Sequence, residues 1–350
     1  MKILIIGNMG YVGPGLVSRL RKNRNNPELI GFDTGYFAHC LTHSVYLPET
    51  ELDTQNFGDV RDFPNGLLKG VDSVVYLAAI SNDPMGAKYE EITFDVNYKS
   101  CIRIAAAAKA AGVRTFVFAS SCSIYGSADD NPKSEKDAVN PLTAYAKSKV
   151  YAEKELEPLA DTNFVVTCLR FATACGISRR LRLDLVLNDF VAGAIVSNEI
   201  QILSDGTPWR PLINVLDMAK AIEWAINRHH NNGGDFLIVN TGSDQWNYQV
   251  KEIAGAIAQV ITGCRITVNK NALQDKRSYK VNFNLFKELA PDHQPDFDLK
   301  DSVVGLADAL KNMNFRDTRF RESQLIRLKV LENLQSAGAL DNDLRWKRFK

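Results

Sequence analysis

Lys2-Ile-Leu-Ile-Ile-Gly7-Asn-Met-Gly10-Tyr-Val-Gly13 opens the chain and decides its fold. The apolar run over residues 2–6 is typical of a strand buried in a parallel sheet. Glycines 7, 10 and 13 predict a tight turn into a helix over about 12–23. Glycine lets backbone N–H groups approach a pyrophosphate at a helix N-terminus. The spacing differs from the common G-x-G-x-x-G pattern, so a strand-turn-helix without a ligand is the alternative.

Short apolar runs and helix-favouring stretches alternate after this opening. We expect strands at 29–33, 71–79, 115–120 and 164–170, and helices at 100–111 and 145–157. This alternation predicts an α/β fold with a doubly wound parallel sheet. From about residue 175 it loosens, which predicts a smaller mixed lobe at the carboxyl edge of the sheet. We expect a first unit over 1–175 with elements returning at 210–245, a discontinuous lobe over 176–316, and a helical tail over 317–350 without assigned chemistry.

The composition is that of an ordinary soluble globular protein. In 350 residues, 45% are hydrophobic and 24% charged, and the net charge is +1. This balance gives no electrostatic reason to expect nucleic acid or an anionic membrane as a partner. No apolar run approaches the roughly 20 residues of a membrane span. The six cysteines show no metal-ligand spacing, so we expect no metal site and a reduced, cytoplasmic chain.

Two acidic residues follow the glycine turn. Asp33 ends the second predicted strand, 20 residues after Gly13. A carboxylate at that point hydrogen-bonds the adenosine ribose and repels a 2′-phosphate, which favours NAD over NADP. Asp59 and Val60 lie in a loop suited to an adenine edge. For Asp59, a solvated loop or a capping role is an equal alternative.

Ser121, Tyr145 and Lys149 supply a hydroxyl, a phenol and an ammonium. Tyr145 and Lys149 are four residues apart, so they share one face of a helix. An ammonium, together with an oxidised nicotinamide, lowers the pKa of a phenol from near 10. Ser121 would orient a substrate hydroxyl. The Y-x-x-x-K spacing alone is poorly specific, and a core Tyr beside a solvent-exposed Lys is its alternative.

These motifs together resemble the extended short-chain dehydrogenases/reductases, and more narrowly the NAD-dependent nucleotide-sugar epimerases and dehydratases. Three further stretches carry the resemblance, namely Leu77-Ala-Ala79, Leu169-Arg-Phe171 and the segment 209–217. The match covers roughly residues 1–310. It implies a Rossmann domain, a C-terminal substrate lobe, bound NAD, a nucleotide-diphosphate sugar as substrate, and a homodimer through the helices near 97–111 and 145–157.

The resemblance also implies roles for individual residues. The catalytic residues are Ser121, Tyr145 and Lys149. The residues that hold the cofactor are Gly7, Gly10, Tyr11, Val12, Gly13, Asp33, Asp59, Val60, Leu77, Ala78, Ala79, Asn97, Ser120, Tyr145, Lys149 and Phe171. The residues that hold the substrate are Ser81, Ser121, Cys122, Ser123, Thr173, Asn188, Arg210 and Arg277. Arg210 would bind the diphosphate, and for Asn188 and Arg277 a structural role is equally open.

The residues after Ser121 bear on the reaction. Sugar dehydratases of this family typically carry an acid there, whereas this chain has Cys122 and Ser123. A neutral Ser cannot replace Glu, and a small buried residue is the commoner interpretation of Cys122. We therefore expect an epimerase acting through a 4-keto intermediate. The alternatives are a 4-dehydrogenase or 4-ketoreductase, then a 4,6-dehydratase, and, in another class, a non-catalytic NAD-binding regulator. The basic loop 179–182 is either a phosphate or acidic-sugar contact or a solvated loop.

Overall fold

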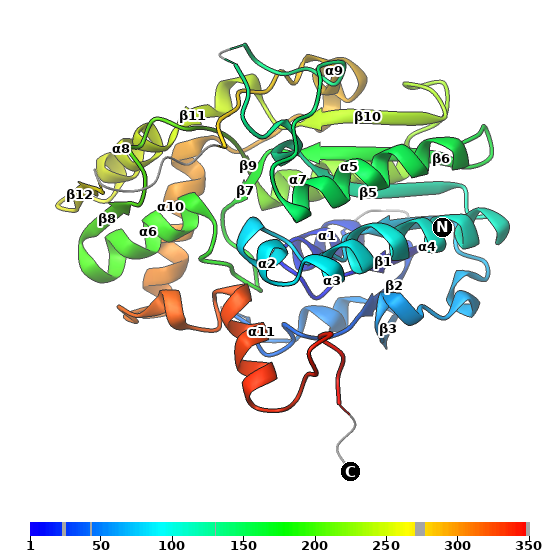
Figure 1. The fold of residues 1–350 in the computed structure, drawn as a ribbon, viewed down its shortest axis with the longest axis horizontal. Coiled ribbons are helices and arrows are strands. Elements are labelled where there is room, and N and C mark those ends of the chain that lie inside the picture. The colour runs from blue at the N-terminus through cyan, green and yellow to red at the C-terminus, as the bar shows by residue number, and fades with distance from the viewer. Residues whose placement is uncertain (23–25, 43, 130, 270–276, 348–350) are drawn as a thin grey trace.

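A seven-stranded parallel sheet forms the centre of the molecule (Figure 1). The computed structural model describes residues 1–22, 26–42, 44–129, 131–269 and 277–347. Across the sheet the strands are β10 (Phe236–Thr241), β6 (Val165–Phe171), β5 (Thr115–Ser121), β4 (Ser73–Tyr76), β1 (Lys2–Ile6), β2 (Glu28–Asp33) and β3 (Thr54–Phe57). The strand order reverses between β1 and β4. Ligands of open α/β sheets bind in the crevice at such a point, at the carboxyl ends of the strands.

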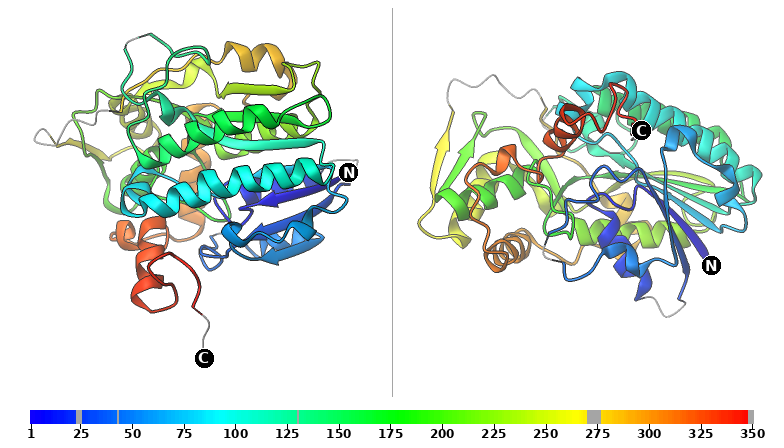
Figure 2. Two further views of the ribbon diagram at one scale, coloured as in Figure 1. Left: turned by 45° about the vertical axis from the view of Figure 1, so that its right-hand side comes forward. Right: turned by 90° about the horizontal axis from the view of Figure 1, so that it is seen from below.

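Helices bury both faces of the sheet. Because side chains alternate along each strand, neighbouring residues are buried on opposite faces. Leu4 and Ile6 face α4 (Ser100–Ala110) and α5 (Ala144–Leu156). Ile3 and Ile5 face α1 (Gly13–Arg21) and α7 (Val215–Asn227). Figure 2 shows helices on both sides of the sheet. The continuous apolar run at 2–6 follows from this double burial, and the predicted doubly wound sheet is confirmed.

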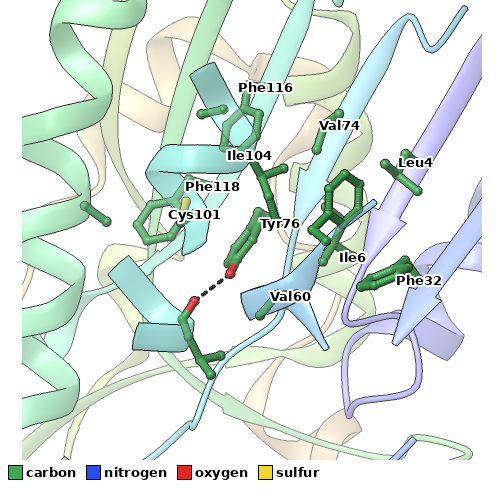
Figure 3. Packing of buried hydrophobic residues seen from close by; sticks show 14 of the residues in the cluster. Leu4, Ile6, Phe32, Val60, Val74, Tyr76, Cys101, Ile104, Phe116 and Phe118 are labelled. Carbon is green, nitrogen blue, oxygen red and sulfur yellow. Dashed lines mark hydrogen bonds between the residues drawn. The ribbon is translucent and has the colours of Figure 1, made fainter. Parts of the chain in front are cut away.

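The core beneath the site is rich in aromatic rings (Figure 3). The ring centroid of Tyr76 lies 6.4 Å from those of Phe116 and Phe118. Its hydroxyl donates a 2.5 Å hydrogen bond to the Val96 carbonyl. Val60 belongs to this cluster and also lines the main cavity. The packing of the core thus continues into one wall of the cavity.

A smaller lobe of mixed structure follows the sixth strand. It contains β7 (Thr173–Cys175), β8 (Glu199–Ile202), β9 (Trp209–Asn214), β11 (Asn247–Gln249) and β12 (Arg265–Val268), in two small sheets. Its helices are α6 (Val186–Ser197), α8 (Val250–Val260) and α10 (Leu299–Asn312). They share an apolar core of their own. The predicted mixed lobe is confirmed as an architecture, while its boundaries at 176–316 stay a prediction.

Three short helices and the C-terminal segment complete the chain. The short helices are α2 (Asp83–Lys88), α3 (Glu90–Phe94) and α9 (Asn284–Leu289). After α10, the described residues of the C-terminal segment form one α-helix, α11 (Arg327–Ser336). After it the chain turns back, and Leu340 bridges Trp346. The expected helical tail is therefore only partly helical, and residues 348–350 of that prediction lie outside the described residues.

Within the described ranges, no helix combines the length and the apolar character needed to cross a membrane.

Candidate active site

A cavity of about 960 Å³ lies at the carboxyl ends of the central strands. It is bounded by the ends of β2, β5 and β6 on one side and by residues of the smaller lobe, such as Gln201 and Val250, on the other. This size is at the upper end for small-molecule sites. The cavity also has the position that the strand order predicts.

The glycine turn forms the floor of this cavity. Gly7 has a φ of +88°, and a Cβ atom there would lie 2.4 Å from the Ala78 backbone nitrogen. A Cβ atom on Gly13 would lie 1.9 Å from the Asn8 carbonyl oxygen. Both positions therefore require glycine. Gly7 and Gly10 line the cavity with Tyr11 and Val12, whereas Gly13 does not, because it is used for close packing of the turn.

Asp33, the last residue of β2, lines the cavity beside the glycine turn. Its carboxylate accepts hydrogen bonds from the backbone N–H groups of Met9 at 3.0 Å and Gly35 at 2.7 Å. Burial raises its pKa, which those two bonds oppose. A carboxylate can accept further bonds, so it has capacity for the hydroxyls of a ribose. The glycine cradle and this acceptor together fit an adenine dinucleotide.

Asp59 lines the cavity and also caps the short helix Val60–Asp62. It accepts from the Arg61 backbone N–H at 2.8 Å and forms an ion pair with the Arg61 guanidinium at 2.5 Å. Burial raises its pKa, but the bonds from Arg61 outweigh burial and hold it below the ordinary value. The predicted capping alternative thus describes its bonds. Other predicted cofactor residues that line the cavity are Val60, Leu77, Ala78, Ala79, Ser120 and Phe171.

Ser121, Tyr145 and Lys149 meet at the inner end of the cavity, and all three line it. Ser121 ends β5, and α5 carries the other two. The Thr143 hydroxyl caps α5 by accepting from the Ala146 N–H at 3.2 Å. The helix therefore begins just before Tyr145, which brings that phenol to the end of β5.

Lys149 is held in a buried position. It is 2% exposed, and its ammonium donates to the Ala119 carbonyl at 2.7 Å. The ammonium lies 5.6 Å from the ring centroid of Tyr145. Burial lowers the pKa of Lys149 to about 8, so at neutral pH it is still mainly charged. The alternative of a solvent-exposed Lys is excluded.

Burial also governs Tyr145. It raises the pKa of the phenol, and a hydrogen bond with the Ser121 hydroxyl opposes this effect. Without the cofactor, the protein therefore does not show the expected lowering of the Tyr145 pKa. The physical reason is that burial penalises the phenolate more than the neighbouring groups favour it.

A buried polar network supports the inner end of the cavity, and the sequence did not indicate it. Glu153 on α5 forms an ion pair with Arg170 on β6 at 2.8 Å. Glu153 also accepts from the Ser120 hydroxyl at 2.5 Å. Arg170 in turn donates to the Tyr125 hydroxyl at 3.0 Å. These bonds fix α5 against the ends of β5 and β6, and hence Tyr145 and Lys149 against Ser121.

Five of the predicted substrate residues besides Ser121 line the cavity, namely Ser81, Ser123, Thr173, Arg210 and Arg277. The Ser81 hydroxyl accepts from the Arg182 guanidinium at 2.9 Å. The Arg210 guanidinium lies 5.9 Å from the ring centroid of Tyr279. Arg277 forms an ion pair with Asp83. No sequence motif indicates Asp83 or Tyr279, and Arg182 is predicted only as part of the basic loop 179–182.

Besides Gly13, three residues predicted to hold a ligand, Cys122, Asn188 and Asn97, do not line the cavity. The Cys122 thiol is fully buried and donates to the Arg170 carbonyl at 3.0 Å. The Asn188 amide bonds Gly176 and the Tyr11 hydroxyl. The Asn97 amide bonds both backbone groups of Ile80 and the Ser148 hydroxyl. Each of these side chains is bonded to residues of the protein behind the cavity wall, and its predicted ligand contact stays a prediction.

The C-terminal tail, to which no chemistry was assigned, also lines the cavity. Arg321, Ile326, Arg327 and Leu328 take part. No sequence motif marks these residues. In the part of the chain that the structure describes, no cluster of three or more potential metal ligands occurs.

Comparison with known proteins shows the family to which the chain belongs. The model of the NAD dependent epimerase/dehydratase family matches residues 3–242. The chain belongs to this family. It is therefore an NAD-dependent enzyme, which confirms the predicted family and cofactor.

Individual relatives have low sequence identity to this chain, but the similarity extends over most of their length. A UDP-glucose 4-epimerase of Corynebacterium glutamicum is 26% identical over 276 residues, which are 74% of this chain and 80% of the relative. A putative UDP-glucose 4-epimerase of Methanocaldococcus jannaschii is 23% identical over 89% of this chain and 99% of the relative. The UDP-glucuronic acid 4-epimerase of Bacillus cereus, solved with UDP-glucuronic acid and NAD, has a TM-score of 0.75 at 20% identity, covering 89% of this chain and all of that chain. This last likeness shows the shared fold.

Proposed function

We propose that the protein is a nucleotide-sugar epimerase that inverts a sugar carbinol, most simply at C4, through a keto intermediate. The observation that carries the proposal is that Ser121, Tyr145 and Lys149 line the same cavity as the glycine cradle and two arginines, Arg210 and Arg277. A dinucleotide and a diphosphate-bearing sugar can thus meet at the three reactive groups. The names of the sequence relatives support the same activity.

Tyr145 acts as the base and then as the acid. Its phenolate oxygen takes the proton of the sugar hydroxyl while the carbon loses hydride, and it gives the proton back when hydride returns to the opposite face. Bound NAD supplies the hydride acceptor and then the hydride donor. The same proton and the same electron pair therefore leave and return, so the reaction has no net redox change.

The two partners of Tyr145 have different tasks. Ser121 holds the sugar oxygen by a hydrogen bond and so fixes its angle to Tyr145. The Lys149 ammonium places a positive charge 5.6 Å from the Tyr145 ring, which favours the phenolate over the phenol. Because burial raises the pKa of Tyr145, this charge and that of the oxidised cofactor are needed to oppose it.

The outer part of the cavity suits the nucleotide diphosphate. Arg210 and Arg277 line it and carry permanent charge. Ser123 lines the cavity beside Ser121, to whose hydroxyl its backbone N–H donates, and its own hydroxyl oxygen finds no hydrogen-bond partner among the described residues. A buried hydroxyl is normally paired, so a sugar oxygen would complete this site.

Dehydration is the weaker alternative for this cavity. It needs an acid beside Ser121 to remove a second proton and expel a hydroxyl. Cys122 is fully buried outside the cavity, and burial raises its pKa far above that of an exposed thiol. A neutral Ser123 cannot take its place. A net 4-dehydrogenase or 4-ketoreductase would use the same residues, and the experiment below separates it from an epimerase.

The test is a panel of UDP-sugars that includes UDP-glucose and UDP-glucuronic acid, with products identified by NMR and the reduced-nicotinamide absorbance followed in parallel. An epimeric product without net absorbance change supports the proposal. Accumulation of a ketosugar with stoichiometric reduced cofactor identifies a dehydrogenase instead. Turnover that persists in Tyr145→Phe would rule out the assigned base.

We further propose that the chain works as a homodimer in a reducing compartment such as the cytoplasm. Support for a dimer comes from an aromatic cluster that joins α5 to the helices before α4 and whose Tyr151 ring is exposed. Tyr151 is 45% exposed and packs against Phe94 at 5.8 Å and Tyr98 at 5.7 Å between ring centroids. All six cysteines are free thiols, which suits a reducing compartment. Sedimentation of wild type against Tyr151→Glu tests the dimer, because a buried charge would dissociate it.

A further inference from the structure

The C-terminal segment, residues 319–347, runs from the smaller lobe back to the first strands of the main sheet. Figure 1 shows α11 below the lobe, with the chain continuing toward β2 and β3. Its first part is anchored to the lobe by the ion pair of Arg321 with Asp189 at 2.8 Å. Its last part contacts the two loops that follow β2 and β3. The first loop directly follows Asp33, and the second contains Asp59 and Val60, which are all predicted cofactor residues.

The loop after β2 is held by Trp346 and Leu344. The Trp346 indole N–H donates to the Thr34 carbonyl at 2.7 Å, and its ring lies 5.9 Å from that of Tyr36. The Tyr36 hydroxyl donates to the Leu344 carbonyl. Thr34 directly follows Asp33, whose carboxylate already binds the same loop at Gly35. The segment therefore restrains the backbone that positions the ribose-binding carboxylate.

The loop after β3 is held by Asp343 and Arg345. Arg61 donates to the Asp343 carbonyl at 2.7 Å, and Arg345 forms an ion pair with Asp62. Arg61 is also the partner of Asp59. The segment thus restrains the loop after β3 through Arg61, which is the residue that orients Asp59.

Arg327 brings a charge to the cavity wall. It is 1% exposed, donates to the Arg180 carbonyl at 2.8 Å, and lies 4.5 Å over the Phe37 ring. Its second terminal nitrogen, Nη1, has no hydrogen-bond partner among the residues described. Buried cations are normally paired, so an anion in this cavity would compensate it. The diphosphate of a dinucleotide supplies two negative charges.

We propose that the C-terminal segment is a working part of the NAD site: it clamps both adenosine-side loops, adds Arg327 to the wall, and thereby slows the release of NAD. The proposal rests on the NAD dependence of the family and not on the identity of the sugar reaction. Four residues of the segment, Asp343 to Trp346, make the contacts with the two adenosine-side loops described above, so a small set of substitutions tests the proposal.

The experiment compares NAD binding to apo protein by titration calorimetry, and NAD release from the holoenzyme, in wild type, Trp346→Ala, Arg345→Gln and the double variant. Each contact of this kind is worth a few-fold in affinity, so the double variant should bind NAD about tenfold more weakly and release it faster. The matched control is Arg114→Gln. Its ion pair with Asp72 at 2.9 Å lies at the opposite, amino ends of the strands, so NAD binding should be unchanged.

Wild-type affinity and release in the double variant would overturn the proposal, as would an equal loss in Arg114→Gln. Urea unfolding of the apo proteins shows whether folding is intact. If the double variant does not fold, Trp346→Phe keeps a smaller aromatic ring and removes the indole N–H donor, and faster NAD release is still expected. A protein that binds NAD as predicted but epimerises no sugar would contradict the proposed function and leave this proposal standing.

Discussion

Replacing Glu153 with Gln should lower the free energy of unfolding by about 4 kcal/mol, because it leaves the buried Arg170 cation uncompensated. The carboxylate accepts from Ser120 at 2.5 Å and from two Arg170 nitrogens at 3.0 and 2.8 Å. The two side chains of the pair are only 5% and 4% exposed. A Gln offers one acceptor oxygen and turns an N–H₂ group toward the guanidinium. For 350 residues, the loss corresponds to a melting temperature lower by about 5 °C.

Urea unfolding measures this loss as a lower midpoint with an unchanged slope. The matched variant is Glu153→Leu combined with Arg170→Met, which removes both charges and should recover most of the lost stability. The turnover of Glu153→Gln should also fall, because the pair fixes α5 against Ser121. A cost below about 1 kcal/mol, the value of an exposed pair, would refute the reasoning. So would a double variant that is as unstable as the sum of the two single changes.

Three further predictions concern the reactive and cofactor-binding groups. Tyr145→Phe should lower turnover about 100-fold or more while NAD content and melting temperature stay near wild type; unchanged turnover would contradict its role as base. Asp33→Asn should reduce the preference for NAD over NADP about tenfold or more, measured as the ratio of the two dissociation constants, and an unchanged ratio would contradict the repulsion argument. Burial lowers the pKa of Lys149 to about 8, so between about pH 8 and 10 this side chain binds fewer protons in the folded apo protein than in the unfolded chain. Its contribution to the unfolding free energy should therefore rise by about 3 kcal/mol across that window, measured as the pH dependence of the difference between wild type and Lys149→Met; a difference that does not change with pH would contradict this.

The sequence predicted the parts of the fold and site that depend on local spacing. The apolar run at 2–6 and the glycines after it specify a buried strand and a tight turn within a dozen residues. The four-residue spacing of Tyr145 and Lys149 specifies one helix face, and both residues line the cavity. Asp33 ends its strand as expected. None of these features needs a contact between distant parts of the chain.

What the sequence missed depends on such contacts. The Glu153–Arg170 pair joins α5 to β6, and only the position of α5 on the sheet brings the two together. Asn97 and Asn188 carry amides that serve a ligand or a wall equally well, and only the folded chain shows which protein groups they bond. Arg327 reaches Phe37 from almost the other end of the chain, without a motif. The raised pKa of Tyr145 likewise follows from burial, which residue spacing does not report.

The most direct test of the central claim is turnover of a UDP-sugar that carries deuterium at C4, with the product examined by NMR. If Tyr145 moves only the hydroxyl proton and the hydride returns to the carbon it left, the epimer should keep its deuterium, and no reduced cofactor should accumulate. Loss of the deuterium to solvent, or its recovery in released reduced cofactor beside a ketosugar, would contradict the account.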